Sequence, residues 1–100
     1  MKFNYDGLTY AVSFSRQWFD ITQGEEIVNT TPYTTVTIKI VDPDTPPASW
    51  ATYRTATVGK WKHDQDIKAL GRIHALRAVS TTLSKGMKQA LWQMYMMRRT

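Results

Sequence analysis

The sequence predicts an α+β fold, in which an antiparallel β-sheet packs against two C-terminal α-helices. Residues 1–61 contain segments that alternate apolar and polar side chains with the two-residue period of strands. The apolar residues between positions 67 and 98 recur every three or four residues instead, as on one face of a helix. Strands followed by helices are typical of α+β proteins, so we expect an N-terminal hairpin, two or three further strands and then the helical layer.

The first fifteen residues predict a β-hairpin. Asp6-Gly7 is a strong signal for a two-residue turn, because glycine tolerates the positive φ that such turns require. The turn sets Tyr5 opposite Leu8 and Phe3 opposite Tyr10. One face of the hairpin then carries the apolar residues Phe3, Tyr5, Leu8, Tyr10, Val12 and Phe14. A sheet that is apolar on one side needs a cover, most simply the helices.

The next segment, residues 16–33, has a weaker pattern. We expect Trp18, Phe19 and Ile21 to close a sheet edge or to fill an interface. Gln23-Gly24 marks a turn, and residues 25–28 form a short strand in this interpretation. Residues 34–41 then predict a clean strand. Its side chains Val36, Ile38 and Ile40 point one way.

Prolines interrupt the pattern at residues 42–47, which we expect to form a loop, since proline cannot donate to a strand ladder. A third long strand is expected over residues 50–61. Arg54 lies in it on the same face as Ala56 and Val58. Gly59 marks either a bulge or the corner that leads to the helices.

The first helix is predicted between residues 67 and 83. Asp64 and Asp66 stand at its start, where carboxylates interact favourably with the unpaired N–H groups. Gly71 in its middle is disfavoured by roughly 1 kcal/mol relative to alanine. We expect a close approach to a neighbouring backbone or to a ligand as the compensation. Ser84 is the expected N-cap of a second helix over residues 85–98.

The second helix has two distinct faces. Met87, Ala90, Leu91, Met94 and Met97 form an apolar stripe, which we expect to pack into the core. Lys88, Trp92, Tyr95 and Arg99 form a second row. This row is either solvated surface or a binding surface, because aromatic rings stack on bases and cations pair with phosphates.

Charge is divided unequally along the chain. Residues 1–66 hold six basic and all eight acidic residues, a net charge of −2, whereas residues 67–100 hold seven basic residues and carry +7. This division predicts that the helical part faces an anionic partner. The length and the 42% hydrophobic content indicate one globular domain spanning residues 1–100, with strands over about 1–61 and helices over about 64–98.

Composition and motifs argue against several classes of protein. There is no cysteine, which excludes disulfides and thiolate chemistry, and no apolar segment approaches a signal peptide or a membrane span. His63 and His74 lack the companion ligands of a metal site. No phosphate-binding glycine loop or nucleophile motif occurs. We therefore expect a soluble intracellular protein that is not an enzyme, with no catalytic residues, metal or cofactor.

Basic and aromatic residues are the candidates for ligand binding, because guanidinium groups pair with phosphates and aromatic rings with bases. The candidate residues are Arg54, Lys68, Arg72, Arg77, Lys88, Trp92, Tyr95, Arg98 and Arg99.

Two segments carry a family resemblance. Gly71-Arg72-Ile73-His74-Ala75-Leu76, followed by Ala90-Leu91-Trp92-Gln93-Met94-Tyr95-Met96-Met97-Arg98, resembles small phage proteins, and most closely the anti-Thoeris family of nucleotide sponges. The resemblance covers about the last 40 residues and rests on short motifs. It implies a homo-oligomer that sequesters a cyclic ADP-ribose isomer, or a cyclic oligonucleotide, without chemistry. Arg72 and Arg98 are the positions that the resemblance assigns to the ligand.

Three functions follow as hypotheses. The first is a phage counter-defence protein of the host cytoplasm that sequesters an anionic nucleotide immune signal. The second is an anti-CRISPR-like inhibitor, whose basic helical face binds nucleic acid or a nucleic-acid-processing complex with a steep dependence on salt. The third is an assembly protein whose methionine-rich helix packs against a partner.

Overall fold

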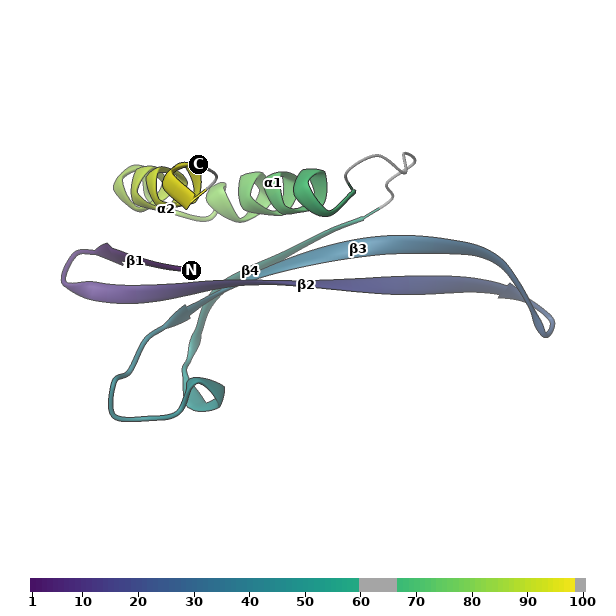
Figure 1. Cartoon of the computed structure of the whole chain (residues 1–100), viewed down its shortest axis with the longest axis horizontal. Helices are drawn as coiled ribbons and strands as arrows, with labels where there is room; N and C mark the ends of the chain where they lie inside the picture. Colours follow the sequence, from purple (N-terminus) through teal and green to yellow (C-terminus); the bar gives the residue numbers. More distant parts are fainter. Residues whose placement is uncertain (60–66, 99–100) are drawn as a thin grey trace.

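The computed structural model describes residues 1–59 and 67–98, and for residues 18–23, 27–32, 67–69 and 98 it describes the backbone alone. Four strands form one antiparallel sheet in the order of the sequence, with two helices lying over one face (Figure 1). The strands are β1 (Lys2–Tyr5), β2 (Leu8–Gln23), β3 (Glu26–Ile40) and β4 (Thr52–Gly59). The helices are α1 (Ile67–Ser80) and α2 (Lys85–Arg98). The predicted α+β class is confirmed.

The N-terminal hairpin has the predicted register. Tyr5 pairs with Leu8 and Phe3 with Tyr10 across a turn in which both Asp6 (φ 51°) and Gly7 (φ 81°) have positive φ. Phe3, Tyr10 and Val12 are buried in the core, as the alternation predicts. Leu8 is the exception on this face, since it adjoins the turn and is 48% exposed.

The second hairpin is longer than predicted. β2 continues to Gln23 and β3 begins at Glu26, so the expected short strand at residues 25–28 and the strand at 34–41 are one continuous element. Gly24 (φ 67°) lies in the turn between them. Pro32 lies inside β3 but has no N–H to donate. The described part of β4 ends opposite Tyr33, so in the described ranges no neighbouring strand on that side requires a hydrogen bond from Pro32. The proposed roles of the Trp18, Phe19 and Ile21 side chains lie outside the described residues.

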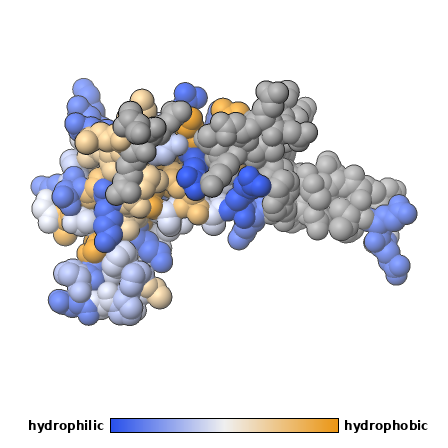
Figure 2. Space-filling model, viewed as in Figure 1, coloured by the Kyte–Doolittle hydropathy of each residue, from blue (hydrophilic) through white to orange (hydrophobic). Residues whose placement is uncertain are grey.

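The predicted loop between β3 and β4 is confirmed. It is longer than expected, because β4 begins at Thr52 and not at residue 50. Trp50 belongs to this loop, where its indole Nε1 donates to the carbonyl oxygens of Asp42 (2.9 Å) and Thr45 (3.2 Å). Figure 2 shows the hydrophilic surface of this projecting loop. A register shift at Ile38/Lys39 follows, since Ile38 pairs with Arg54 and Lys39 with Thr52. The predicted residues 60 and 61 of this strand lie outside the described ranges.

The core lies between the sheet and the helices. α1 packs over β3 and β4, and α2 packs over β1. The buried apolar residues are Phe3, Tyr10, Val12, Val36, Ile38, Ala75, Leu76, Val79, Met87, Leu91 and Tyr95. Two interpretations of α2 are corrected here. Tyr95 takes a core position one turn after Leu91, whereas Met97, expected in the core, is 71% exposed near the end of the helix.

The helix boundaries agree with the capping signals. Ser84 caps α2, because its Oγ accepts a hydrogen bond from the Met87 N–H at 3.3 Å. The two helices are joined by a short hydrogen-bond chain. Trp92 Nε1 donates to Ser80 Oγ at 2.9 Å, and that hydroxyl donates to the Leu76 carbonyl oxygen at 2.6 Å. The expected positions of Asp64 and Asp66 before α1 lie outside the described residues.

The molecule is elongated, because the β2–β3 hairpin extends past the helical layer (Figure 1). The principal extents are 52 × 29 × 24 Å and the radius of gyration is 15.7 Å. A compact domain of this length has a radius of gyration of about 13 Å. We call the projecting part of the hairpin, residues 17–32, the arm. In the part of the chain that the structure describes, the arm is a two-stranded ribbon, whereas the body of the sheet has three or four strands.

Candidate functional site

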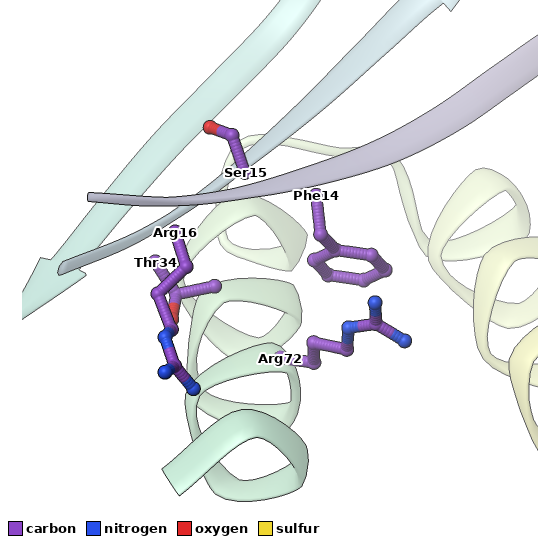
Figure 3. Close-up of a pocket in the computed structure, with 5 residues that line it drawn as sticks. All are labelled: Phe14, Ser15, Arg16, Thr34 and Arg72. Atoms are coloured by element: carbon purple, nitrogen blue, oxygen red, sulfur yellow. The ribbon is translucent and has the colours of Figure 1, made fainter. Parts of the chain in front are cut away.

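A pocket lies at the base of the arm, and its lining residues come from β2, β3 and α1. Its volume is about 300 Å³, at the lower end of the range for small-molecule sites. The residues that line it are Phe14, Ser15, Arg16, Thr34 and Arg72. Figure 3 shows the side chains of Phe14, Arg16, Thr34 and Arg72 on one side of the β2 ribbon, with Ser15 pointing away from them.

Strand alternation places three of these residues on the helix-covered face. Phe14 lies opposite the core residue Val36, and Arg16 lies opposite Thr34. Phe14, Arg16 and Thr34 therefore lie on the same face of the sheet as the core. The apolar side chains of this face give way to polar ones at Arg16 and Thr34. The pocket therefore begins where the hydrophobic core ends.

Gly71 sets the distance between α1 and the sheet. A Cβ at this position would overlap the Thr34 hydroxyl, so the helix reaches β3 only because residue 71 has no side chain. The close approach predicted for Gly71 is thus made to a strand side chain.

The Thr34 hydroxyl is the unusual group of this pocket. Thr34 is 3% exposed, and its Oγ1 has no hydrogen-bond partner among the described residues. Leaving such a hydroxyl unsatisfied in a protein interior costs about 1–3 kcal/mol. A buried polar atom without a described partner beside a cavity is a candidate for a hydrogen bond to a bound group.

Arg72 and Phe14 form the opposite wall. The Arg72 guanidinium carbon lies 5.0 Å from the centroid of the Phe14 ring, within the range of a cation–π contact. Phe14 in turn contacts Tyr95 at 6.4 Å between centroids, and Tyr95 contacts Trp92 edge-on at 6.1 Å. These rings hold Phe14 in place from the side of α2.

The described lining of the pocket is positively charged. Arg16 and Arg72 contribute two guanidinium groups, and none of the five described lining residues is acidic. Such a lining suits the binding of an anion.

Of the predicted binding residues, Arg72 lies in this pocket and five others have described positions elsewhere. Arg54 is exposed on β4 and turns back on Tyr53, where it donates from Nη1 to the carbonyl oxygen at 2.7 Å. Arg77 and Lys88 are exposed on α1 and α2. Trp92 and Tyr95 do not form an exposed row with Lys88, because Tyr95 is 7% exposed and Trp92 is half-buried against Ser80.

Three predicted positions cannot be placed at the pocket. The side chains of Lys68 and Arg98 lie outside the described residues, as do all of Arg99 and the histidine His63. The other histidine, His74, is half-buried on α1.

Phe14 was expected only as a core residue, and Arg16 and Thr34 were missed. The signal for both is the same alternation that predicts the strands. The apolar series Tyr10, Val12 and Phe14 reaches Arg16 two residues later, and the series of Val36 and Ile38 begins at Thr34. A charged and a hydroxyl residue that continue two paired apolar stripes mark the point where a covered face becomes polar.

Other classes of site find no support among the described residues. No group of three or more His, Asp or Glu side chains gathers there as a metal site would require. Within the same ranges no helix is both long and apolar enough to cross a membrane. Comparison with protein-family models, curated proteins and solved structures finds no significant match.

Proposed function

We propose that this protein binds and sequesters an anionic nucleotide in the pocket between α1, β2 and β3, without a chemical step. The observation that carries the proposal is the unpartnered, buried Thr34 hydroxyl beside two arginines and an aromatic ring. Together with the resemblance of residues 71–98 to nucleotide sponges, this composition favours a counter-defence role against a nucleotide immune signal.

Each group has a distinct part in such a complex. The Arg16 and Arg72 guanidinium groups present planar sets of N–H donors, which match the oxygens of a phosphate. The Thr34 hydroxyl donates to a third oxygen and loses its desolvation penalty. The Phe14 ring offers a face for a base, in place of or next to the Arg72 guanidinium that lies over it.

The size of the pocket limits what one protomer encloses. A volume of about 300 Å³ holds a phosphate group with part of a nucleoside. A cyclic dinucleotide-sized signal therefore extends past the five lining residues. Since the lining side chains offer no acid–base pair, binding without turnover is the expected outcome.

The test is titration calorimetry with cyclic ADP-ribose isomers, comparing Arg72→Ala with Arg77→Ala. Both variants remove one positive charge from the same helix, but Arg77 is exposed and is not part of the pocket. We expect Arg72→Ala to weaken binding by about tenfold or more, since a hydrogen bond to a charged group contributes about 1.5–3 kcal/mol. Arg77→Ala should leave the affinity nearly unchanged.

Short DNA and RNA, titrated at two salt concentrations, address the second hypothesis. If both variants weaken polymer binding equally, and binding falls steeply with salt while the small nucleotides do not bind, the basic face serves nucleic acid instead. Nucleotide binding that is unaffected by Arg72→Ala would contradict the pocket assignment. Thermal melting of each variant separates a loss of binding from a loss of fold.

A further inference from the structure

The outer edge of β2 has neighbours over only part of its length. β1 pairs with Leu8, Thr9, Tyr10 and Ala11, and Met1 exchanges hydrogen bonds with Val12. From Ser13 to Gln23 no strand of the described ranges lies on this side. Natural proteins seldom leave so long an edge without a partner, a bulge or a charge to protect it.

The direction of the backbone groups along this edge follows from one residue. Val12 donates its N–H to the Met1 carbonyl oxygen at 2.7 Å, so its backbone groups face the outer edge. Thr9, by contrast, accepts from Val41 on the β3 side at 2.9 Å. Because strand residues alternate in direction, the N–H and C=O groups of Phe14, Arg16, Trp18 and Asp20 face outward with those of Val12. The register of β2 with β3 is regular as far as Ile21.

We propose that a second copy of this chain pairs with this outer edge, antiparallel, about a two-fold axis at the Trp18 backbone. Antiparallel pairing of an edge with itself is the isologous contact of a symmetric dimer. In this register Trp18 lies opposite Trp18 of the second copy. Arg16 lies opposite Asp20 of the second copy, and Asp20 opposite its Arg16.

Two independent features support this register. The outward-facing positions 16, 18 and 20 of one copy meet the outward-facing positions of the other, so these three pairs are the hydrogen-bonded pairs of the ladder and alternate with non-hydrogen-bonded ones. Arg16 and Asp20 are the only charged residues between positions 13 and 23, and this register alone sets each opposite the other's counter-charge. Opposite charges on directly paired residues stabilise a sheet, and like charges destabilise it.

The shape of the chain also favours a second copy as the partner. The arm extends the radius of gyration to 15.7 Å, compared with about 13 Å for a compact chain of this length. A lone two-stranded ribbon is marginally stable in water, and pairing with the two strands of a second arm makes it a four-stranded sheet.

The paired edge adjoins the pocket, because Arg16 belongs to both. A guanidinium has five N–H donors and serves a carboxylate and a phosphate together.

The test is sedimentation equilibrium of the full chain and of charge variants across a wide concentration range. The wild type should form a dimer. Asp20→Arg sets like charges opposite each other at two places and should weaken the dimer by about tenfold or more. The double variant R16D/D20R restores opposite charges in both pairs and should dimerise like the wild type.

Amide hydrogen exchange measures whether the backbone N–H groups on the outer edge of β2 are protected. The Trp18 amide should be protected at high concentration and become exchangeable in Asp20→Arg, because its N–H faces the second copy. The Gln17 amide, which faces β3, is the internal control and should stay protected in both.

A monomeric wild type overturns the proposal, and so does a double variant that stays as weak as Asp20→Arg. Sedimentation is measured without nucleotide, so a failure of the dimer is distinguished from a failure of nucleotide binding, which Arg72→Ala tests on α1.

Discussion

At the scale of single residues, the proposed role of Thr34 links stability to binding. Its hydroxyl is buried without a partner among the described residues, an arrangement that lowers the stability of the protein without ligand and favours a bound group that accepts a hydrogen bond from it. Residues at binding sites often show this conflict, because a group arranged for a ligand is not satisfied within the protein itself.

Thr34→Val should therefore raise the stability of the empty protein and weaken its ligand binding. The change removes the hydroxyl and keeps the shape, so we expect an increase of about 1 kcal/mol in the free energy of unfolding. Urea denaturation measures this increase, and titration with cyclic ADP-ribose isomers measures the affinity. Thr34→Ser retains the hydroxyl and should bind like the wild type. A less stable Thr34→Val variant would show that the hydroxyl has a role within the fold.

Tyr10 makes the stability of the protein depend on pH in the alkaline range. Burial raises the pKa of its hydroxyl, with smaller contributions from Tyr53, Asp6 and Tyr5. The folded chain thus holds this proton more tightly than the unfolded chain does. The resulting stability is complete below the unfolded pKa of about 10, and it is lost as pH rises through the higher folded value.

Tyr10→Phe should accordingly reduce the loss of stability at alkaline pH. The variant keeps the ring that stacks on Phe3 at 5.3 Å between centroids and removes the titrating group. Urea midpoints at about pH 8 and about pH 11 give the comparison, since the hydroxyl titrates above pH 10. An equal alkaline loss in both proteins would mean that other groups, such as the lysines, account for it.

At the scale of elements, the contact between α1 and β3 depends on Gly71. The helix interior disfavours glycine by about 1 kcal/mol relative to alanine, yet a Cβ here would overlap Thr34. The packing of α1 against β3 thus requires glycine at position 71, whereas the helix alone would favour alanine there.

Gly71→Ala should destabilise the wild-type protein more than it destabilises the Thr34→Ala variant. Thr34→Ala removes the hydroxyl that the new methyl group would overlap, although the Cβ of residue 34 remains 3.3 Å away, so the overlap is relieved in part and the preference of a helix for alanine offsets more of the loss. Four proteins, the wild type, both single variants and the double variant, complete a cycle of denaturation measurements. Additive effects in this cycle would mean that the helix and strand do not share this contact.

Elements near the turns and caps could be predicted from the sequence. The Asp6-Gly7 turn, the alternation around Val36 and the Ser84 cap depend on neighbouring residues alone, and each is confirmed. The length of β2 and β3 was not predictable in this way. Pro32 interrupts the usual strand signal, and it lies beyond the last described pair of β3 with β4, a register that no local pattern reveals.

The site shows the same limit. Arg72 could be singled out from its sequence context, whereas Arg16 and Thr34 become partners only through the register that sets them opposite each other. The row of Lys88, Trp92 and Tyr95 was expected to share one surface. The spacing of these residues fits one face of a helix. In the structure, however, Tyr95 packs against the sheet and is buried in the core, where it contacts Phe14.

At the scale of the whole molecule, the helices and the arm divide the sheet into two parts. The body, where α1 and α2 cover one face, holds the core, and the arm extends past it (Figure 1). The pocket lies at the boundary between the two. A ligand bound there, as proposed, would contact both α1 and β2 and so connect the covered body to the base of the arm.

The order of strands in the sheet, identical to their order in the chain, also has a consequence for biosynthesis. Each strand pairs with the one translated just before it, so the sheet can assemble one hairpin at a time. The helices that cover its apolar face are translated after all four strands. The nascent chain therefore presents an uncovered apolar sheet until α1 and α2 emerge, which makes this interval of synthesis the one at which chaperones would protect it from aggregation.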